Sequence, residues 1–126
     1  MSGTYRELRV WQRSLDLVME VYRSTKGFPK DEVYGLVSQM RRAAVSVSSN
    51  IAEGKGRSSD KELVVFLCHA RGSVLEVETQ ALIAKRLGYF GDDVEERLQG
   101  LTAEVGKLLN GLINSLRKSI EGPAAA

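Results

Sequence analysis

Residues 59–88 read SDKELVVFLCHARGSVLEVETQALIAKRLG and carry the clearest structural signal in the chain. The first four residues form a capping box, in which the side chains of Ser59 and Glu62 satisfy free amides at a helix start. Apolar residues then recur every three or four positions, as in a helix that buries one face. They are Leu63, Phe66 or Leu67, Ala70, Val74, Val77, Ala81 and Ala84. With Gly88 as a stop signal, the pattern predicts a helix over residues 59–87.

Three more segments show the same period, so we expect helices at residues 8–26, 31–53, 59–87 and 92–121. Four amphipathic helices joined by short links predict an all-α, antiparallel up-and-down four-helix bundle. The length of 126 residues suits a single domain, residues 1–126, with Ala124 to Ala126 as a frayed tail. The expected inward residues are Leu8, Trp11, Leu15, Val18 and Tyr22 in the first helix, Leu36, Met40, Ala44, Val47 and Ile51 in the second, and Val94, Leu98, Leu101, Val105, Leu108, Leu112, Leu116 and Ile120 in the fourth.

Helices three and four carry further apolar residues beside these rows. They are Val64, Cys68, Leu75, Leu82 and Ile83 in the third helix, and Leu109 and Ile113 in the fourth. One explanation is a wide core, and the other is an interface between subunits, and the pattern alone favours neither. If the second holds, Val64 and Leu75 are the residues that we expect at the interface.

Charge distribution and cysteine content indicate which partners and which cellular location to expect. The net charge is only +2, but residues 1–57 hold ten Lys and Arg against six Asp and Glu, so the first half is the basic half. The longest uncharged run, Ala43 to Ala52, is about half of what a membrane span needs, so we expect no membrane partner. The single Cys68 cannot form an internal disulfide, which predicts a reducing, cytoplasmic location.

The residues that could carry catalysis do not form a usable set. Cys68 and His69 are neighbours in the chain, but consecutive helical side chains point about 100° apart, so they do not make a nucleophile and its base. One Cys and one His cannot hold zinc, and the Glu-x-x-His pairs of di-iron bundles are missing. We therefore predict no enzymatic activity, no metal and no cofactor.

The basic residues near the loop at Gly54–Ser59 are the candidates for binding an anion. Arg41, Lys55 and Arg57 combine the basic half, a glycine-containing loop and the positive end of the third helix, so they form the expected nucleic-acid patch. Arg42 fits this patch or a structural pairing with Glu53 or Glu76. Aromatic residues interleaved with the cations, as in single-strand binders, are missing from this segment.

A second polar set is expected to be structural. The side chains lie beside the apolar row of helix two or opposite it on helix three, and they comprise Arg42, Asn50, Glu53, Arg71 and Glu76. Such a partly buried network would hold helix two in register.

Several motifs resemble one known family. They are Val10-Trp11-Gln12, Phe28-Pro29, Tyr34-Gly35-Leu36, Arg41-Arg42-Ala43-Ala44, Ser49-Asn50-Ile51-Ala52-Glu53-Gly54, Phe66-Leu67, Gly72-Ser73 and Leu87-Gly88-Tyr89. In these residues the chain resembles the 23S rRNA intervening-sequence proteins from about Tyr5 to Lys118. The resemblance implies a cytoplasmic four-helix bundle that assembles as a homopentamer without established enzymatic activity. It also implies an association with nucleic acid, since related accessory proteins of diversity-generating retroelements bind it through basic surface.

Two functions therefore follow from the sequence. The first is a homo-oligomeric, RNA-associated scaffold, in which weak phosphate contacts add across subunits. The alternative is a protein-interaction scaffold that binds no nucleic acid.

Overall fold

The computed structural model describes residues 3–122 and contains four long helices in this range. They are α1 (Arg9–Thr25), α2 (Leu36–Lys55), α3 (Asp60–Arg86) and α4 (Asp92–Glu121), with short 3₁₀ turns η1 (Tyr5–Glu7) and η2 (Lys30–Glu32). These residues include no strand, and the predicted all-α class is confirmed. The expected tail at Ala124 to Ala126 lies outside the described residues.

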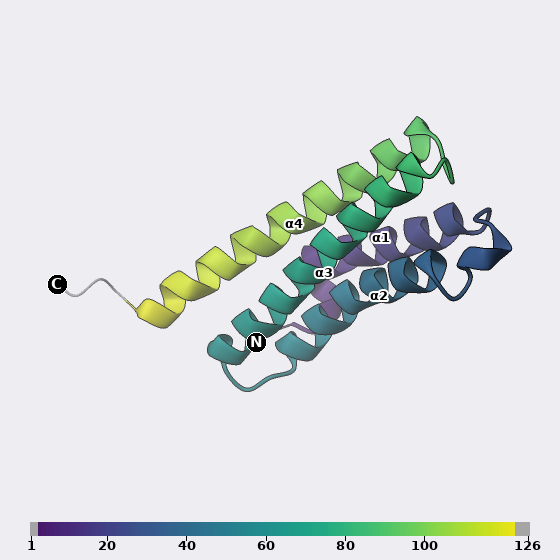
Figure 1. The fold of residues 1–126 in the computed structure, drawn as a ribbon. Helices are drawn as coiled ribbons and strands as arrows, with labels where there is room; N and C mark the ends of the chain where they lie inside the picture. The colour runs from purple at the N-terminus through teal and green to yellow at the C-terminus, as the bar shows by residue number, and fades with distance from the viewer. Residues whose placement is uncertain (1–2, 123–126) are drawn as a thin grey trace.

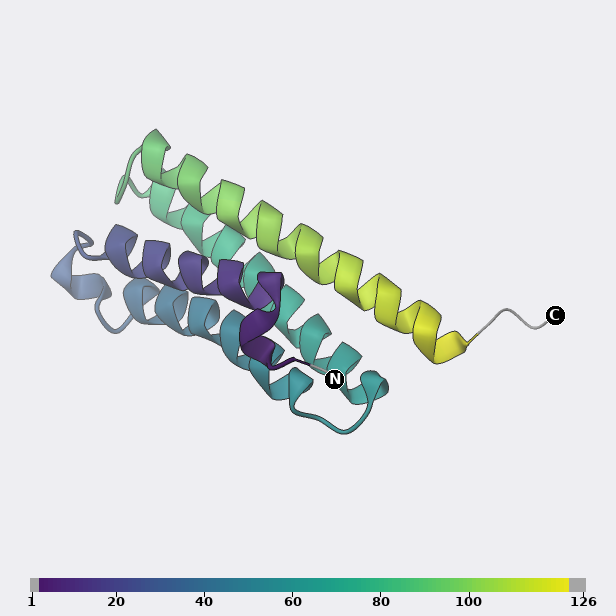
Figure 2. The same cartoon turned by 180° about the vertical axis from the view of Figure 1, so that it is seen from behind.

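The helices form an antiparallel four-helix bundle. Consecutive helices pack side by side, and α4 closes the bundle by packing against α1 (Figures 1 and 2). Within the described residues α1 does not contact α3, so these two helices are diagonal to each other across the bundle. The outer faces of α1 and α3 therefore point to opposite sides of the molecule.

The helix ends agree with the sequence at α3 and differ at α2. Ser59 Oγ accepts a hydrogen bond from the Glu62 amide at 3.2 Å, as the capping box predicts. The prediction that helix two begins near Asp31 is wrong, because residues 30–32 form η2 instead. The Glu32 carboxylate then accepts a hydrogen bond from the Leu36 amide at 3.1 Å and caps the true start of α2.

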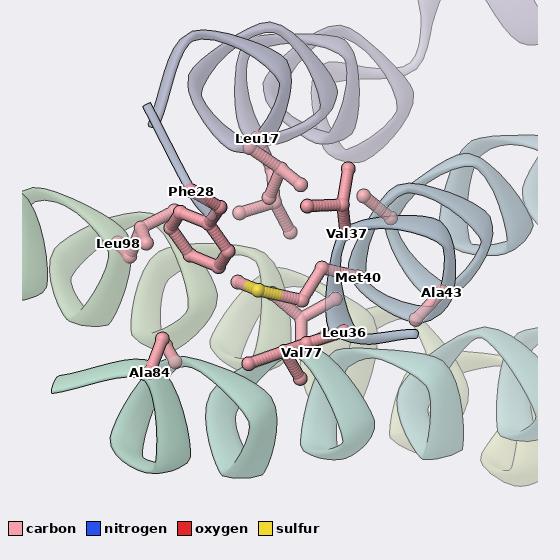
Figure 3. Close-up of a cluster of buried hydrophobic side chains, with 12 residues drawn as sticks. Leu17, Phe28, Leu36, Val37, Met40, Ala43, Val77, Ala84 and Leu98 are labelled. Atoms are coloured by element: carbon pink, nitrogen blue, oxygen red, sulfur yellow. The ribbon is translucent and has the colours of Figure 1, made fainter. Parts of the chain in front are cut away.

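One core fills the bundle from end to end. Near the α1–α2 connection, Leu17 of α1, Met40 of α2, Val77 of α3 and Leu98 of α4 meet in the interior (Figure 3). The other half is built around fully buried Val47, Ile51, Leu67, Val105 and Leu109. The inward rows predicted for α2 and for α3 are buried as expected.

The first helix turns a different face inward from the one predicted. The buried row is Val10, Ser14, Leu17 and Val21, while Leu15 and Tyr22 of the expected row are exposed. Both rows follow the helical period, and the other residues of the expected row, Leu8, Trp11 and Val18, are half-buried against the core. In α4, likewise, Leu109 and Ile113 are core residues, although the pattern ranks them as extra.

Small side chains line the contacts of α2. Its buried positions include Ala43, Ala44, Ser48 and Gly54, and α2 packs against both α1 and α3. Gly54 lies within the last turn of the helix, not beyond its end as the sequence predicted. A Cβ atom there would lie 2.7 Å from the Cβ of Phe66, so α2 and α3 approach closely at this point.

No helix between residues 3 and 122 combines the length and hydropathy that crossing a bilayer requires.

Candidate functional site

Arg41, the first of the predicted nucleic-acid residues, is held against α1. Its Nε donates to Thr25 Oγ1 at 3.0 Å, and Nη2 donates to the Tyr22 carbonyl at 3.4 Å. The guanidinium carbon lies 4.5 Å from the centre of the Tyr22 ring. Arg41 is therefore fixed in place at the C-terminal end of α1, with its cation stacked on an aromatic face.

Lys55 and Arg57 lie at the opposite end of α2. Arg57 pairs with Glu53 at 3.1 Å and lies over the Phe66 ring at 4.7 Å. Fourteen residues of helix, or about 21 Å, separate Arg41 from Lys55. The single basic patch that the sequence predicted is therefore not assembled within one chain.

The predicted polar network does not form as a unit either. Asn50 donates to the Ser46 carbonyl at 2.9 Å, and Arg71 donates to Asn110 of α4 at 3.0 Å. Arg42 and Glu76 line one shallow depression between α2 and α3, but no hydrogen bond or ion pair joins them in the described structure. The reason is spacing, since Arg42 and Glu53 are three turns apart on the outer side of α2.

Short hydroxyl contacts join α2 to both neighbours in place of that network. The buried Ser14 and Ser48 hydroxyls are 2.8 Å apart, and Ser73 of α3 donates to Ser46 Oγ at 2.9 Å. Neither of these two serine contacts was predicted from the sequence. The signal was their place at the edges of the apolar rows, where a small polar side chain can be buried only with a partner.

Glu20 is the buried carboxylate of the bundle. Burial opposes its ionisation, but hydrogen bonds from Ser24 (2.9 Å), Arg97 (3.3 Å) and Arg23 (3.4 Å) outweigh this, so the pKa of Glu20 lies below its ordinary value. Arg13 and Glu104 form a second α1–α4 pair at 2.8 Å. Both carboxylates face arginine across a helix contact, so we assign them to structure.

Cys68 and His69 point in different directions. The Cys68 sulfur lies 3.8 Å from both Arg71 Nη2 and Arg117 Nη2, whereas exposed His69 contacts the edge of Phe66. Residues 3–122 contain no group of three His, Cys, Asp or Glu side chains that could hold a metal ion. The absence of enzymatic activity stays a prediction.

The outer face of α1 and α2 carries two adjoining grooves, with Val45 lining both. One has a volume of 280 Å³ and is lined by Trp11, Leu15 and Val18 of α1 and small residues of α2. The other has a volume of 760 Å³ and lies beside the α1–α2 connection. Its polar lining includes Tyr22, Lys26, Tyr34, Arg41 and Arg42.

Exposed apolar side chains gather on two sides of the bundle. On the α1–α2 face they are Leu15, Met19, Tyr22 and Val45, and on the α3 face they are Val65, Leu75, Leu82 and Ile83. Of the two predicted interface residues, Leu75 is 57% exposed. Val64 is only 9% exposed and packs into the chain's own core, so it is not part of the outer face.

Comparison with known proteins identifies a family and a similar structure. Residues 6–111 match the family described as 23S rRNA-intervening sequence protein. No significant match exists among curated proteins. A crystal structure of a protein with unknown function from the S23 ribosomal protein family, from Bacteroides thetaiotaomicron, is similar with a TM-score of 0.74. The two sequences are 21% identical over 82% of this chain and 97% of that chain, and at this identity the likeness shows the fold alone.

Proposed function

Because the chain belongs to the 23S rRNA-intervening sequence protein family, we propose that it is a cytoplasmic, non-enzymatic, homo-oligomeric scaffold that associates with RNA. The observation that supports assembly is the pair of uncovered apolar faces. A monomeric protein rarely leaves such groups of side chains in water on two sides.

The position of the two faces favours head-to-tail assembly. Because the α1–α2 face and the α3 face differ and lie on opposite sides, one face of a subunit fits the other face of the next. Such heterologous contacts close into a ring when the rotation allows it. We propose five subunits, as the family resemblance implies.

Self-association can be tested with one variant of each face. Light scattering of the parent should give a mass several times 13.9 kDa, and five times if the ring is a pentamer. Leu15→Asp with Met19→Asp breaks the α1–α2 face, and Leu75→Asp with Ile83→Asp breaks the α3 face. Each double variant alone should be a monomer with unchanged helicity, and Ser115→Asp, at an exposed position of α4, serves as the control.

Mixing the two variants tests the heterologous geometry. Each retains the face that the other lacks, so the mixture should form a dimer and stop there. If the parent is a monomer at micromolar concentration, the scaffold proposal fails. If the mixture stays monomeric, the faces do not bind each other.

The proposed association with RNA rests on the small positive charge of each subunit, which is repeated in every copy of the assembly. Five copies at +2 each carry a summed positive field, and weak phosphate contacts add when subunits are linked. Filter binding of a structured RNA over a salt series measures it, and a steep loss of affinity with salt is expected. If no binding occurs at low salt, the alternative of a protein-interaction scaffold holds, which the internal pairing of Arg57 favours.

A further inference from the structure

The 760 Å³ groove beside the α1–α2 connection combines cations with aromatic rings. It is formed by the end of α1, the connection and the first half of α2, at the dark-blue end of the bundle in Figure 1. Lys26, Arg41 and Arg42 line it, and its lining contains no carboxylate. Its volume lies within the usual range of ligand sites.

The positive charge of this groove is not neutralised by the surrounding chain. In the described structure, none of Lys26, Arg41 and Arg42 forms an ion pair. The connection holds two carboxylates, neither of which lines the groove: Asp31 is exposed, and Glu32 accepts hydrogen bonds from the Leu36 amide and from the Tyr89 hydroxyl at 2.8 Å. Glu76 lies in the neighbouring depression beside Arg42 and is exposed to solvent.

Two tyrosines of the groove offer ring surface next to these cations. Tyr22 carries the Arg41 guanidinium on its ring and belongs to the α1–α2 face used in assembly, so the ring left for a base is that of Tyr34. Tyr34 is 96% exposed, so no packing inside the chain accounts for an aromatic side chain there. No aromatic residues are interleaved with the cations in the sequence, because Tyr22 and Tyr34 come from different segments and line one groove with Arg41 and Arg42 only in the fold.

We propose that this groove binds single-stranded RNA, with an unpaired base stacked on Tyr34 and the flanking phosphates near Lys26, Arg41 and Arg42. Single-strand binders combine these two features, a cationic track for the backbone and an aromatic ring for the base. A paired base has both faces covered by its neighbours, so a duplex offers only phosphates to this groove. The proposal specifies the RNA association proposed above and rests on it.

Anisotropy of two labelled RNAs tests this inference on the full-length protein. One is an unstructured 12-mer, and the other is the same 12-mer annealed to its complement as a blunt-ended duplex. The parent should bind the 12-mer more tightly. Tyr34→Ala should weaken that binding at least about fivefold, the lower limit for losing one stacked base. Tyr34→Phe retains the ring and should bind like the parent.

Charge variants separate the phosphates from the base. Arg42→Gln with Lys26→Gln should lower the salt slope by about 0.7 for each lost phosphate contact. Arg86→Gln with Lys118→Gln, at exposed positions outside the groove, is the matched control and should leave the salt slope unchanged. Because Tyr34 and Arg42 are exposed, helicity and assembly size should not change in these variants.

The outcomes distinguish this inference from the proposed function. If RNA binding survives Tyr34→Ala, or if the duplex binds as well as the 12-mer, the groove assignment is overturned while RNA association stands. The same holds if only a Lys55 and Arg57 double variant loses binding. If the parent binds neither RNA at low salt, both proposals fail.

Discussion

Gly54→Ala should destabilise the protein, although alanine is the better helix former. The added methyl group would lie 2.7 Å from Phe66 Cβ and 3.0 Å from Leu63 Cδ1. Phe66 Cβ is attached directly to the α3 backbone, so the contact can be relieved only by moving one helix away from the other. Overpacking of this kind costs about 1–3 kcal/mol, and we expect the upper part of that range because the backbone must move.

The gain in helix propensity offsets part of this cost. Replacing glycine with alanine inside a helix stabilises by about 1 kcal/mol, which leaves a net loss of about 2 kcal/mol for Gly54→Ala. Gly100 provides a matched control, because it lies inside α4, is exposed and has no atom within 4 Å of an added Cβ. Gly100→Ala should therefore gain about 0.5–1 kcal/mol of stability.

Urea unfolding followed by circular dichroism measures both variants. Protein concentration must be the same in every sample, since assembly makes the apparent stability depend on concentration. The midpoint should fall for Gly54→Ala and rise for Gly100→Ala. If the two variants are stabilised equally, the close approach of α2 and α3 at Gly54 is wrong.

Three further changes test the contacts around the bundle. Glu53→Ala removes only an exposed ion pair with Arg57, so thermal unfolding should show a loss of stability of no more than about 0.5 kcal/mol. A loss of about 2 kcal/mol would mean that Glu53 belongs to the structural polar network predicted from the sequence. Glu20 has a lowered pKa in the fold, so its stabilisation is present above about pH 4.3, the unfolded value, and is lost as pH falls toward the folded one. Glu20→Gln should therefore lose less stability than the parent in that acidic range. Ser48→Ala should cost about 1 kcal/mol in urea unfolding, and the double change with Ser14→Ala should cost less than twice that, because the two hydroxyls share one contact.

Local chemistry was enough to predict the number of helices and their class. The N-cap at Ser59 and the apolar row of α2 were predicted from local sequence, and the structure confirms both. In α1 two rows share the helical period, one through Leu17 and one through Leu15. A periodic pattern cannot rank such rows, since the choice depends on what the other helices cover.

The candidate site was harder to predict, because the residues that contact its arginines come from other helices. Arg41 is held by residues of α1 that lie sixteen and nineteen positions away, and nothing in its own segment indicates them. Arg57 fits a loop cation in the sequence, yet it is stacked on Phe66 of the following helix. Tyr34 stands out in the sequence only as part of the motif Tyr34-Gly35-Leu36, and its exposure is evident only in the fold.

The small side chains of α2 also determine which helices of the bundle can open locally. Bulky residues keep backbones apart and leave gaps that solvent reaches when side chains fluctuate, whereas Ala44, Ser48 and Gly54 bring two neighbouring backbones close to that of α2. Amide protons of α2 can then exchange with deuterium only when a neighbouring helix separates from it, which links their exchange to the opening of a large part of the molecule. The second half of α4 has no such constraint, because its end is bordered by half-buried Leu116 and Ile120. Deuterium should therefore enter the bundle from the end of α4 and reach the middle of α2 last.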